Sequence, residues 1–310
     1  MIVPTLARMI VREHLYKPIT GRVLCLGRQT IGITYEQFVE LLKQENYLVS
    51  NDVLDSTKSE HDNQTRVGKK NSDFISDKVF FDLLGIKQVR SMDVSTYEKA
   101  DIIHDLNKPI PKNLEGQFDF IIDGGTFDHL FDLRTAFENV VKMLKVGGKV
   151  FQWNAASNFA GDTYLSFGPD FFYDYYVLNK FADCKVYLAE VDVRGGQKEQ
   201  WDIYEFVGTK YRYFYSKRVV MVIVLAEKGP SSTYSRMPVQ LQYRDAHLKQ
   251  EYEDNQKIIS LSARRSYRGS ARTKIKALAN KIRNRIVREI GYLGTSEEKV
   301  IQGYRYVGKI

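Results

Sequence analysis

FDFIIDGGTFDHLFDLRTAFENVVKMLKVGGKV, residues 118–150, is the stretch that decides the fold of this chain of 310 residues. Its apolar run at residues 120–122 ends on Asp123 and is followed at once by Gly124 and Gly125. That pattern is typical of a buried parallel strand whose carboxyl end opens into a turn. In an open α/β sheet, such turns bind the ligand.

A helix is expected directly after this turn. Apolar residues recur there at helical spacing, namely Leu133, Ala136, Phe137, Val140, Val141 and Leu144. Lys142 and Lys145 complement the negative end of the helix dipole, and Gly147 and Gly148 end the helix. A further strand begins at Val150. The stretch thus predicts a strand, a helix and a strand, with a functional edge at residues 123–129.

The same alternation of strands and helices runs through the first 228 residues. Five strands are expected at residues 22–27, 88–93, 101–105, 118–123 and from 150 onward, and two late strands at 186–193 and 219–226. No helical pattern joins the two late strands, so one of them is expected to be antiparallel. The sequence therefore predicts an α/β fold with a Rossmann-like doubly wound sheet, mostly parallel and seven-stranded.

The positive charge of the chain lies at one end. The net charge is +8, yet residues 229–310 hold 17 Lys and Arg against 7 Asp and Glu, so the excess belongs to them. We expect residues 1–228 to form the main domain, with residues 50–72 as a polar surface insertion or mobile loop. Residues 229–310 are expected to be a basic helical C-terminal extension.

Within this extension, residues 264–288 contain ten basic side chains and no acidic one, with Ile275, Leu278, Ile282 and Ile286 at helical spacing. A basic amphipathic helix at residues 264–290 can bind an anionic membrane surface, nucleic acid or an acidic protein. The alternative is a helix that docks on the main domain through its isoleucine face. An anionic membrane is the partner that best matches both the charge and the apolar face.

Several classes of protein are disfavoured by composition. The longest apolar run, residues 219–226, has the length of a strand, and the N-terminal residues interleave charges with apolar side chains. We therefore expect a cytoplasmic protein, peripheral at a membrane if the basic helix binds one. Cys25 and Cys184 have apolar neighbours and are read as buried thiols, and the five histidines lack metal-ligand spacing.

Four residues at the ends of expected strands suit a nucleoside-like ligand. Gly27 lets a ligand approach the backbone, while Asp93, Asp105 and Asp123 can accept hydrogen bonds from ribose hydroxyls and an adenine amine. Asp52, 25 residues after Gly27, is the rival ribose acid by spacing, but it borders the polar insertion. We choose Asp93, because it ends a strand.

At these positions the chain resembles the class I S-adenosylmethionine-dependent methyltransferases. The resemblance covers roughly residues 20–228 and is carried by residues 118–150, while ADIIHDLN (100–107) and SMDVSTYE (91–98) are similar to a bacterial methyltransferase-like group. It implies S-adenosyl-L-methionine as the cofactor. The implied cofactor-binding residues are Gly27, Arg28, Gln29, Asp93, Asp105, Asp123 and Gly124.

The first-strand segment VLCLGRQTIG, residues 23–32, departs from the pattern of this superfamily. Cys25 takes the place of the usual acidic residue, and Arg28 and Gln29 stand where a second glycine is customary. Gln29 offers the cofactor's amino group only a neutral amide. Arg28 is unusual beside a cationic sulfonium, although it can bind the cofactor's carboxylate or an anionic acceptor.

Asp128 and His129 are the candidate catalytic residues, because they follow the fourth strand's Asp123 by five and six positions. A neutral His129 can take a proton from an acceptor hydroxyl. The alternatives are a packed histidine at the start of the next helix and a helix N-terminal acid. The aromatic segment 161–176 is expected to be either a lid over the acceptor or an ordinary packed helix.

These residues predict S-adenosylmethionine-dependent methyl transfer to a hydroxyl or amine of a small molecule or glycan. The alternative is a catalytically inactive binding or regulatory protein with the methyltransferase fold, favoured by the departures at Cys25, Arg28 and Gln29. A nucleic-acid methyltransferase that holds phosphates with the basic tail is a weaker alternative.

Overall fold

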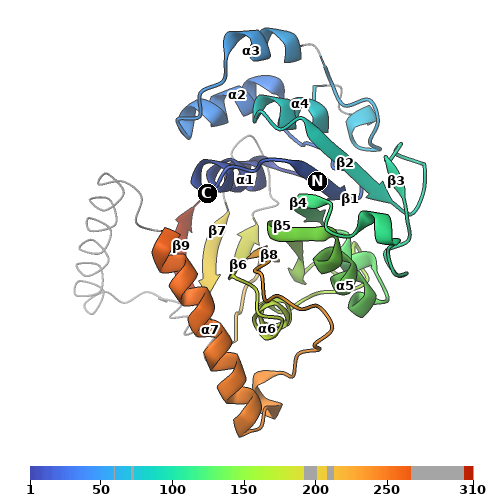
Figure 1. Cartoon of the computed structure of the whole chain (residues 1–310). Coiled ribbons are helices and arrows are strands. Elements are labelled where there is room, and N and C mark those ends of the chain that lie inside the picture. Colours follow the sequence, from blue (N-terminus) through green and yellow to red (C-terminus); the bar gives the residue numbers. More distant parts are fainter. Residues whose placement is uncertain (59, 71–72, 192–200, 208–212, 267–303, 310) are drawn as a thin grey trace, which may run out of the picture.

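A computed structural model describes the chain except residues 59, 71–72, 192–200, 208–212, 267–303 and 310. Nine strands of the described part form one sheet, in the order β3-β2-β1-β4-β5-β8-β6-β7-β9 (Figure 1). The strands are β1 Arg22–Leu26, β2 Gln88–Asp93, β3 Ile102–Ile103, β4 Phe118–Gly124, β5 Leu144–Ser157, β6 Asp183–Val191, β7 Asp202–Phe206, β8 Val219–Glu227 and β9 Tyr304–Lys309.

The predicted α/β sheet is confirmed, with one difference in its extent. Strands β1 to β5 pair in parallel, and β8 is antiparallel to both β5 and β6. The seven expected strands are therefore present, but β7 and β9 extend the sheet beyond β6, and β7 also runs antiparallel to its neighbours. Both added strands are short and mix charged residues with aromatic ones, so neither contains a long apolar run like that of β8.

Seven α-helices cover the two faces of the sheet. They are α1 Pro4–Tyr16, α2 Tyr35–Gln44, α3 Asn51–Thr57, α4 Asp77–Leu83, α5 Leu133–Met143, α6 Pro169–Leu178 and α7 Ala246–Ser266, among the described residues. The first four lie on one side and the last three on the other (Figure 1). Strand β1 shows how the sheet separates two cores: Leu24 packs toward α5 and α6, and Cys25 packs toward α1, α2 and α4.

Local sequence signals fix two of the helix starts. The Thr34 hydroxyl accepts a hydrogen bond from the Gln37 N–H, and the Gln37 side chain accepts one from the Thr34 N–H, which together form a capping box. The Ser76 hydroxyl likewise accepts from the Val79 N–H at the start of α4. In both helices a side-chain oxygen thus satisfies an N–H group of the first turn.

The polar stretch 50–72 contains more structure than its composition indicates. Helix α3 forms within it and contacts α4. The Tyr35 hydroxyl donates to the Leu54 carbonyl oxygen, which ties α3 to α2. A seven-residue helix is too short to show a clear apolar period, and tertiary contacts hold it in place.

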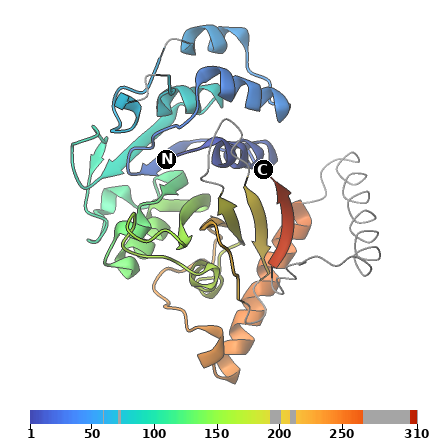
Figure 2. The ribbon, with the colours of Figure 1, turned by 180° about the vertical axis from the view of Figure 1, so that it is seen from behind.

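The C-terminal extension joins the main fold at two places. Helix α7 contacts α6 and β6 on one face of the sheet, and β9 pairs with β7 as the last strand at its edge (Figures 1 and 2). The predicted basic helix at residues 264–290 lies almost entirely outside the described residues. The division at residue 228 and the anionic membrane partner stay predictions. Among the described residues, no helix is long and apolar enough to cross a membrane.

Candidate functional site

A cleft of about 320 Å³ lies at the carboxyl ends of β1, β2 and β4 and just beyond β3. Strand β1 has β2 on one side and β4 on the other, so the chain's crossovers leave in opposite directions at this point. Such a switch point is the ordinary ligand site of an open α/β sheet. Four of the predicted site residues line this cleft: Gly27, Asp93, Asp105 and His129.

At Gly27 the main chain itself lines the cleft. Its φ of 70° lies in the left-handed region, and its N–H donates to the Met92 carbonyl oxygen at 2.7 Å. A Cβ at this position would lie 3.4 Å from the Thr126 hydroxyl oxygen, which donates a hydrogen bond to the Leu26 carbonyl oxygen. A glycine at position 27 therefore allows the left-handed turn and adds no side chain to the cleft.

The two cleft carboxylates are held by their own turns. Asp93 Oδ1 accepts from the Ser95 N–H at 2.9 Å, and Asp105 Oδ1 accepts from the N–H and the side-chain amide of Asn107. The bonds from Asn107 lower the pKa of Asp105 below its usual value. Local hydrogen bonds thus orient both carboxylates, whereas Asp52 lies in α3 and is not part of the cleft lining.

Asp123, predicted to touch the cofactor, is fully buried and is not part of the cleft lining. Its Oδ1 accepts from the N–H groups of Thr126 and Phe127, and its Oδ2 accepts from the amides of Gln152 and Asn154. Burial raises its pKa to about 6, although these hydrogen bonds act in the opposite direction. In the structure Asp123 organises the turn after β4.

Arg28 and Gln29 also turn away from the cleft. Arg28 forms an ion pair with Asp77 at 3.0 Å, so α4 neutralises its charge. The Gln29 amide donates to the Leu26 carbonyl oxygen, and its side chain packs over Gly124, where a Cβ would lie 2.0 Å from Gln29 Oε1. The residues that replace the customary glycine therefore fill space inside the fold and leave the cleft free of positive charge from Arg28.

Asp128 and His129 occupy a short 3₁₀ turn, Phe127–His129. The His129 side chain is 52% exposed and lines the cleft, and its Nε2 lies 3.8 Å from Asp128 Oδ1. Asp128 is buried behind it, with Oδ2 accepting from the Ala155 N–H and Oδ1 lacking a hydrogen-bond partner among the described residues. Burial raises the pKa of Asp128. The geometry gives His129 access to a ligand and places the Asp128 carboxylate near its Nε2.

We expect Asp128→Asn to stabilise the folded protein at neutral pH by about 1 kcal/mol or more. Folding raises the pKa of Asp128 above the unfolded value of 3.8, so the folded state loses stability as pH rises through that window. The advantage of the amide should therefore shrink as pH falls toward 4. Urea denaturation between pH 4 and pH 8 measures it.

Asp132→Asn is the matched control, because the exposed Asp132 caps α5 and hydrogen bonds from Thr135 lower its pKa. This variant should lose stability above pH 4. A loss of stability at pH 7 in Asp128→Asn would contradict the reading of Asp128 as a destabilising buried carboxylate.

The sequence reasoning missed the polar residues that support the site. Thr126 contacts Asp123 and Leu26, and Asn107 Oδ1 accepts from the N–H groups of Phe131 and Asp132 beside the cleft. Gln152 and Asn154 alternate with Trp153 in a buried strand, and this period of two places both amides on the side of Asp123. Polar residues two positions apart inside an otherwise apolar strand are a sequence pattern that indicates a buried polar partner.

The predicted lid divides into two parts. Phe172, Tyr175 and Tyr176 of α6 are buried in the core, which agrees with ordinary helix packing. Tyr164 is 71% exposed, and its ring centroid lies 6.2 Å from that of His129. The segment before α6 therefore lies beside His129, while α6 itself belongs to the core.

Comparison with known proteins gives only weak likenesses. No protein-family profile matches the chain, and no curated protein matches it. Among solved structures, the citrinin polyketide synthase CMeT domain is similar at 10% identity and a TM-score of 0.37, over 73% of this chain and 52% of that one. The aligned part thus spans about half of that protein.

Two further structures are similar to this chain. A methyltransferase of Thermotoga maritima, described as S-adenosylmethionine-dependent and a possible histamine N-methyltransferase, shares 12% identity with a TM-score of 0.36, over 73% of this chain and 88% of that one. The cyclase SpnF shares 13% identity with a TM-score of 0.36, over 73% and 80%. Likenesses at this level assign no function to this chain.

Proposed function

We propose that this protein binds S-adenosyl-L-methionine in the cleft beside β1 and transfers the methyl group to a hydroxyl or amine of a small molecule or glycan. The observation that carries the proposal is the convergence of Gly27, Asp93, Asp105 and His129, from separate strand ends, on one cleft at the switch point of the sheet.

The charges of the cleft support this cofactor over a phosphorylated one. The lining contains Asp93 and Asp105 but neither lysine nor arginine, and Arg28 is paired with Asp77. Asp105 is already paired with the exposed Lys108 at 3.5 Å, whereas Asp93 has no lysine or arginine beside it in the lining. A pyrophosphate would therefore meet an uncompensated carboxylate at Asp93, whereas a cationic sulfonium suits it. The residues present therefore fit S-adenosylmethionine better than a dinucleotide.

Each residue then has a stated role. Asp93 accepts hydrogen bonds from ribose hydroxyls, Asp105 accepts from the adenine amine, and Gly27 lets the ligand approach the main chain. The bound cofactor supplies a methyl group that is already activated as a sulfonium. His129 takes the proton of the acceptor, and the nearby Asp128 carboxylate favours the resulting imidazolium. Alignment of the two substrates supplies much of the remaining rate.

The alternative, a binding protein without turnover, has an observation of its own. Cys25 is fully buried in β1, and the Gln29 amide is bonded to the Leu26 carbonyl oxygen. Neither side chain offers the cofactor's amino group a partner. Binding of cofactor with no methyl transfer to any acceptor would favour this alternative.

We expect Asp93→Ala to weaken the binding of S-adenosylhomocysteine by roughly 1.5–3 kcal/mol, because a charged acceptor for ribose hydroxyls is lost. Isothermal titration calorimetry on the folded variant measures the change. Asp52→Ala is the control, since Asp52 lies in α3 away from the cleft lining, and it should bind normally. An equal loss in both variants would refute the assignment of Asp93.

A further inference from the structure

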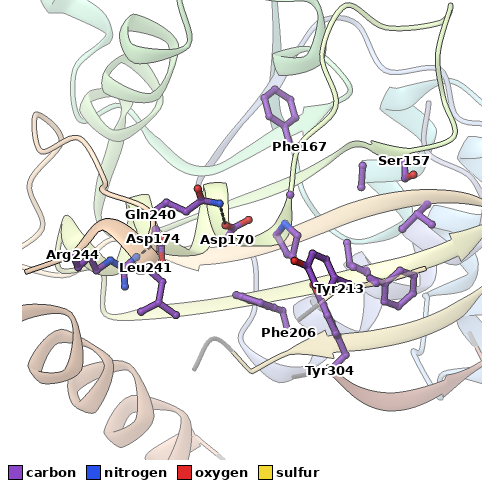
Figure 3. A pocket seen from close by; sticks show the side chains of 16 residues that line it. Ser157, Phe167, Asp170, Asp174, Phe206, Tyr213, Gln240, Leu241, Arg244 and Tyr304 are labelled. Atoms are coloured by element: carbon purple, nitrogen blue, oxygen red, sulfur yellow. Dashed lines mark hydrogen bonds and ion pairs between the residues drawn. The ribbon is translucent and has the colours of Figure 1, made fainter. Parts of the chain in front are cut away.

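A second cavity, of about 390 Å³, lies on the face of the sheet that α6 and α7 cover (Figure 3). Strands β5, β6, β7, β8 and β9 and the start of α6 line it. Segment 164–167 links this cavity to the turn that holds Asp128 and His129, because the Tyr164 and Leu165 N–H groups donate to the Asp128 carbonyl oxygen. Phe167, at the end of this segment, lines the cavity.

One end of the cavity is polar and carries an excess of negative charge. Asp174 and Arg244 are both buried and form an ion pair, and the Arg244 guanidinium stacks at 3.4 Å on the Tyr252 ring. Asp170, at the start of α6, accepts a hydrogen bond from the Gln240 amide at 3.2 Å. Since Arg244 balances one of the two carboxylates, the lining keeps one uncompensated negative charge and disfavours phosphate or carboxylate ligands.

The other end is an aromatic wall. The rings of Phe206 and Phe214 each contact the ring of Tyr304, with centroids 5.6 Å and 5.3 Å apart. Tyr213 is 77% exposed at the mouth, and Figure 3 shows it near Phe206 and Tyr304. The two strands that extend the sheet, β7 and β9, supply Phe206 and Tyr304. They therefore build a surface on which a ring can stack.

We propose that this cavity binds an uncharged, hydroxylated ring, that is, a sugar unit without phosphate or carboxylate groups. Asp170 accepts hydrogen bonds, whereas Gln240 and Arg244 can donate them. Sugar hydroxyls both donate and accept, so they satisfy this mixed set, whereas an ammonium group only donates. The apolar face of the ring packs on the aromatic wall. That this sugar is the methyl acceptor rests on the proposed function.

The test is a titration of the full chain with unphosphorylated methyl glycosides of glucose, galactose, mannose and N-acetylglucosamine, observed by saturation-transfer NMR. Glucose 6-phosphate and cyclohexylamine are the anionic and cationic comparisons. We expect at least one glycoside to bind with a Kd of about 10 mM or below, and the phosphate to bind at least about tenfold more weakly.

Two variants locate the binding. Asp170→Asn keeps the side-chain size and Tyr213→Ala removes an exposed ring, and each should weaken glycoside binding by about tenfold. S-adenosylhomocysteine binding should remain unchanged in both. In Asp93→Ala, S-adenosylhomocysteine binding should weaken while glycoside binding remains unchanged. This variant therefore distinguishes the cavity from the cofactor cleft.

Binding of cyclohexylamine in place of every glycoside would overturn the proposal, as would the absence of any glycoside binding. Unchanged glycoside binding in both variants would overturn it as well. Glycoside binding that depends on Asp170 and Tyr213, in a protein that does not bind S-adenosylhomocysteine, would support the sugar site and refute the proposed function.

Discussion

Replacing Asp123 by alanine is expected to lower the free energy of unfolding by roughly 3–5 kcal/mol, because several buried donors are left without an acceptor at a cost of about 1–3 kcal/mol each. Four donors would lose their acceptor at once: the N–H groups of Thr126 and Phe127 and the amides of Gln152 and Asn154.

Neither amide can replace its lost hydrogen bond by rotating to exchange the positions of its oxygen and nitrogen. The Gln152 Oε1 accepts from the Tyr176 hydroxyl, and the Asn154 Oδ1 accepts from the Asp128 N–H, so each amide is fixed by a second bond. Urea denaturation measures the loss. Asp119→Ala, a change of the same type on the same strand, removes a partly exposed ion pair with Lys145 and an exposed hydrogen bond from the Arg22 N–H, and should cost roughly 1–2 kcal/mol. Similar losses in both variants would contradict the central role of Asp123.

Replacing His129 by alanine is expected to lower the rate of methyl transfer by about 10²- to 10⁴-fold, the usual contribution of a general base. Its side chain is half exposed at the cleft and is not part of a core cluster, so the fold should persist. S-adenosylhomocysteine affinity should change little. The measurement is transfer of a labelled methyl group to a glycoside that binds the second cavity.

His104→Ala is the matched control for this prediction. His104 also lines the cleft, but it lies beside Asp105 at the end of β3. Its loss should affect cofactor affinity and leave the rate at saturating cofactor nearly unchanged. Equal losses of rate in the two variants, or unfolding of His129→Ala, would show that His129 is a packing residue.

The part of the site that could be predicted from the sequence consists of residues at the ends of strands. Gly27, Asp93 and Asp105 lie at or just after the carboxyl ends of their strands, and the carboxyl ends of parallel strands meet at one edge of the sheet. Strand periodicity alone therefore brings them together. Asp123 obeys the same rule and yet points inward, because Gln152 and Asn154 of the neighbouring strand bind it. A pattern within one strand cannot reveal its partners on the next.

The unpredicted features depend on contacts between distant segments. Arg28 was expected beside the cofactor, but Asp77, 49 positions away in sequence, holds it against α4. Strands β7 and β9 lack a long apolar run, and β9 pairs with a strand about a hundred positions earlier. Their aromatic rings contact one another across the two strands, Tyr204 with Tyr306 and Phe206 with Tyr304, and a pattern within one strand does not reveal such a partner.

The central claim, that the cleft beside β1 binds S-adenosylmethionine, is tested most directly by calorimetric titration of the unaltered chain with S-adenosylmethionine and S-adenosylhomocysteine, with NAD as the comparison. We predict binding of one equivalent of each adenosyl compound with a Kd of roughly 1–100 μM, and NAD at least about a hundredfold weaker, because its pyrophosphate meets the Asp93 carboxylate in a cleft lining without lysine or arginine. Absence of binding by either adenosyl compound at millimolar concentration, or equally tight binding of NAD, would contradict the account.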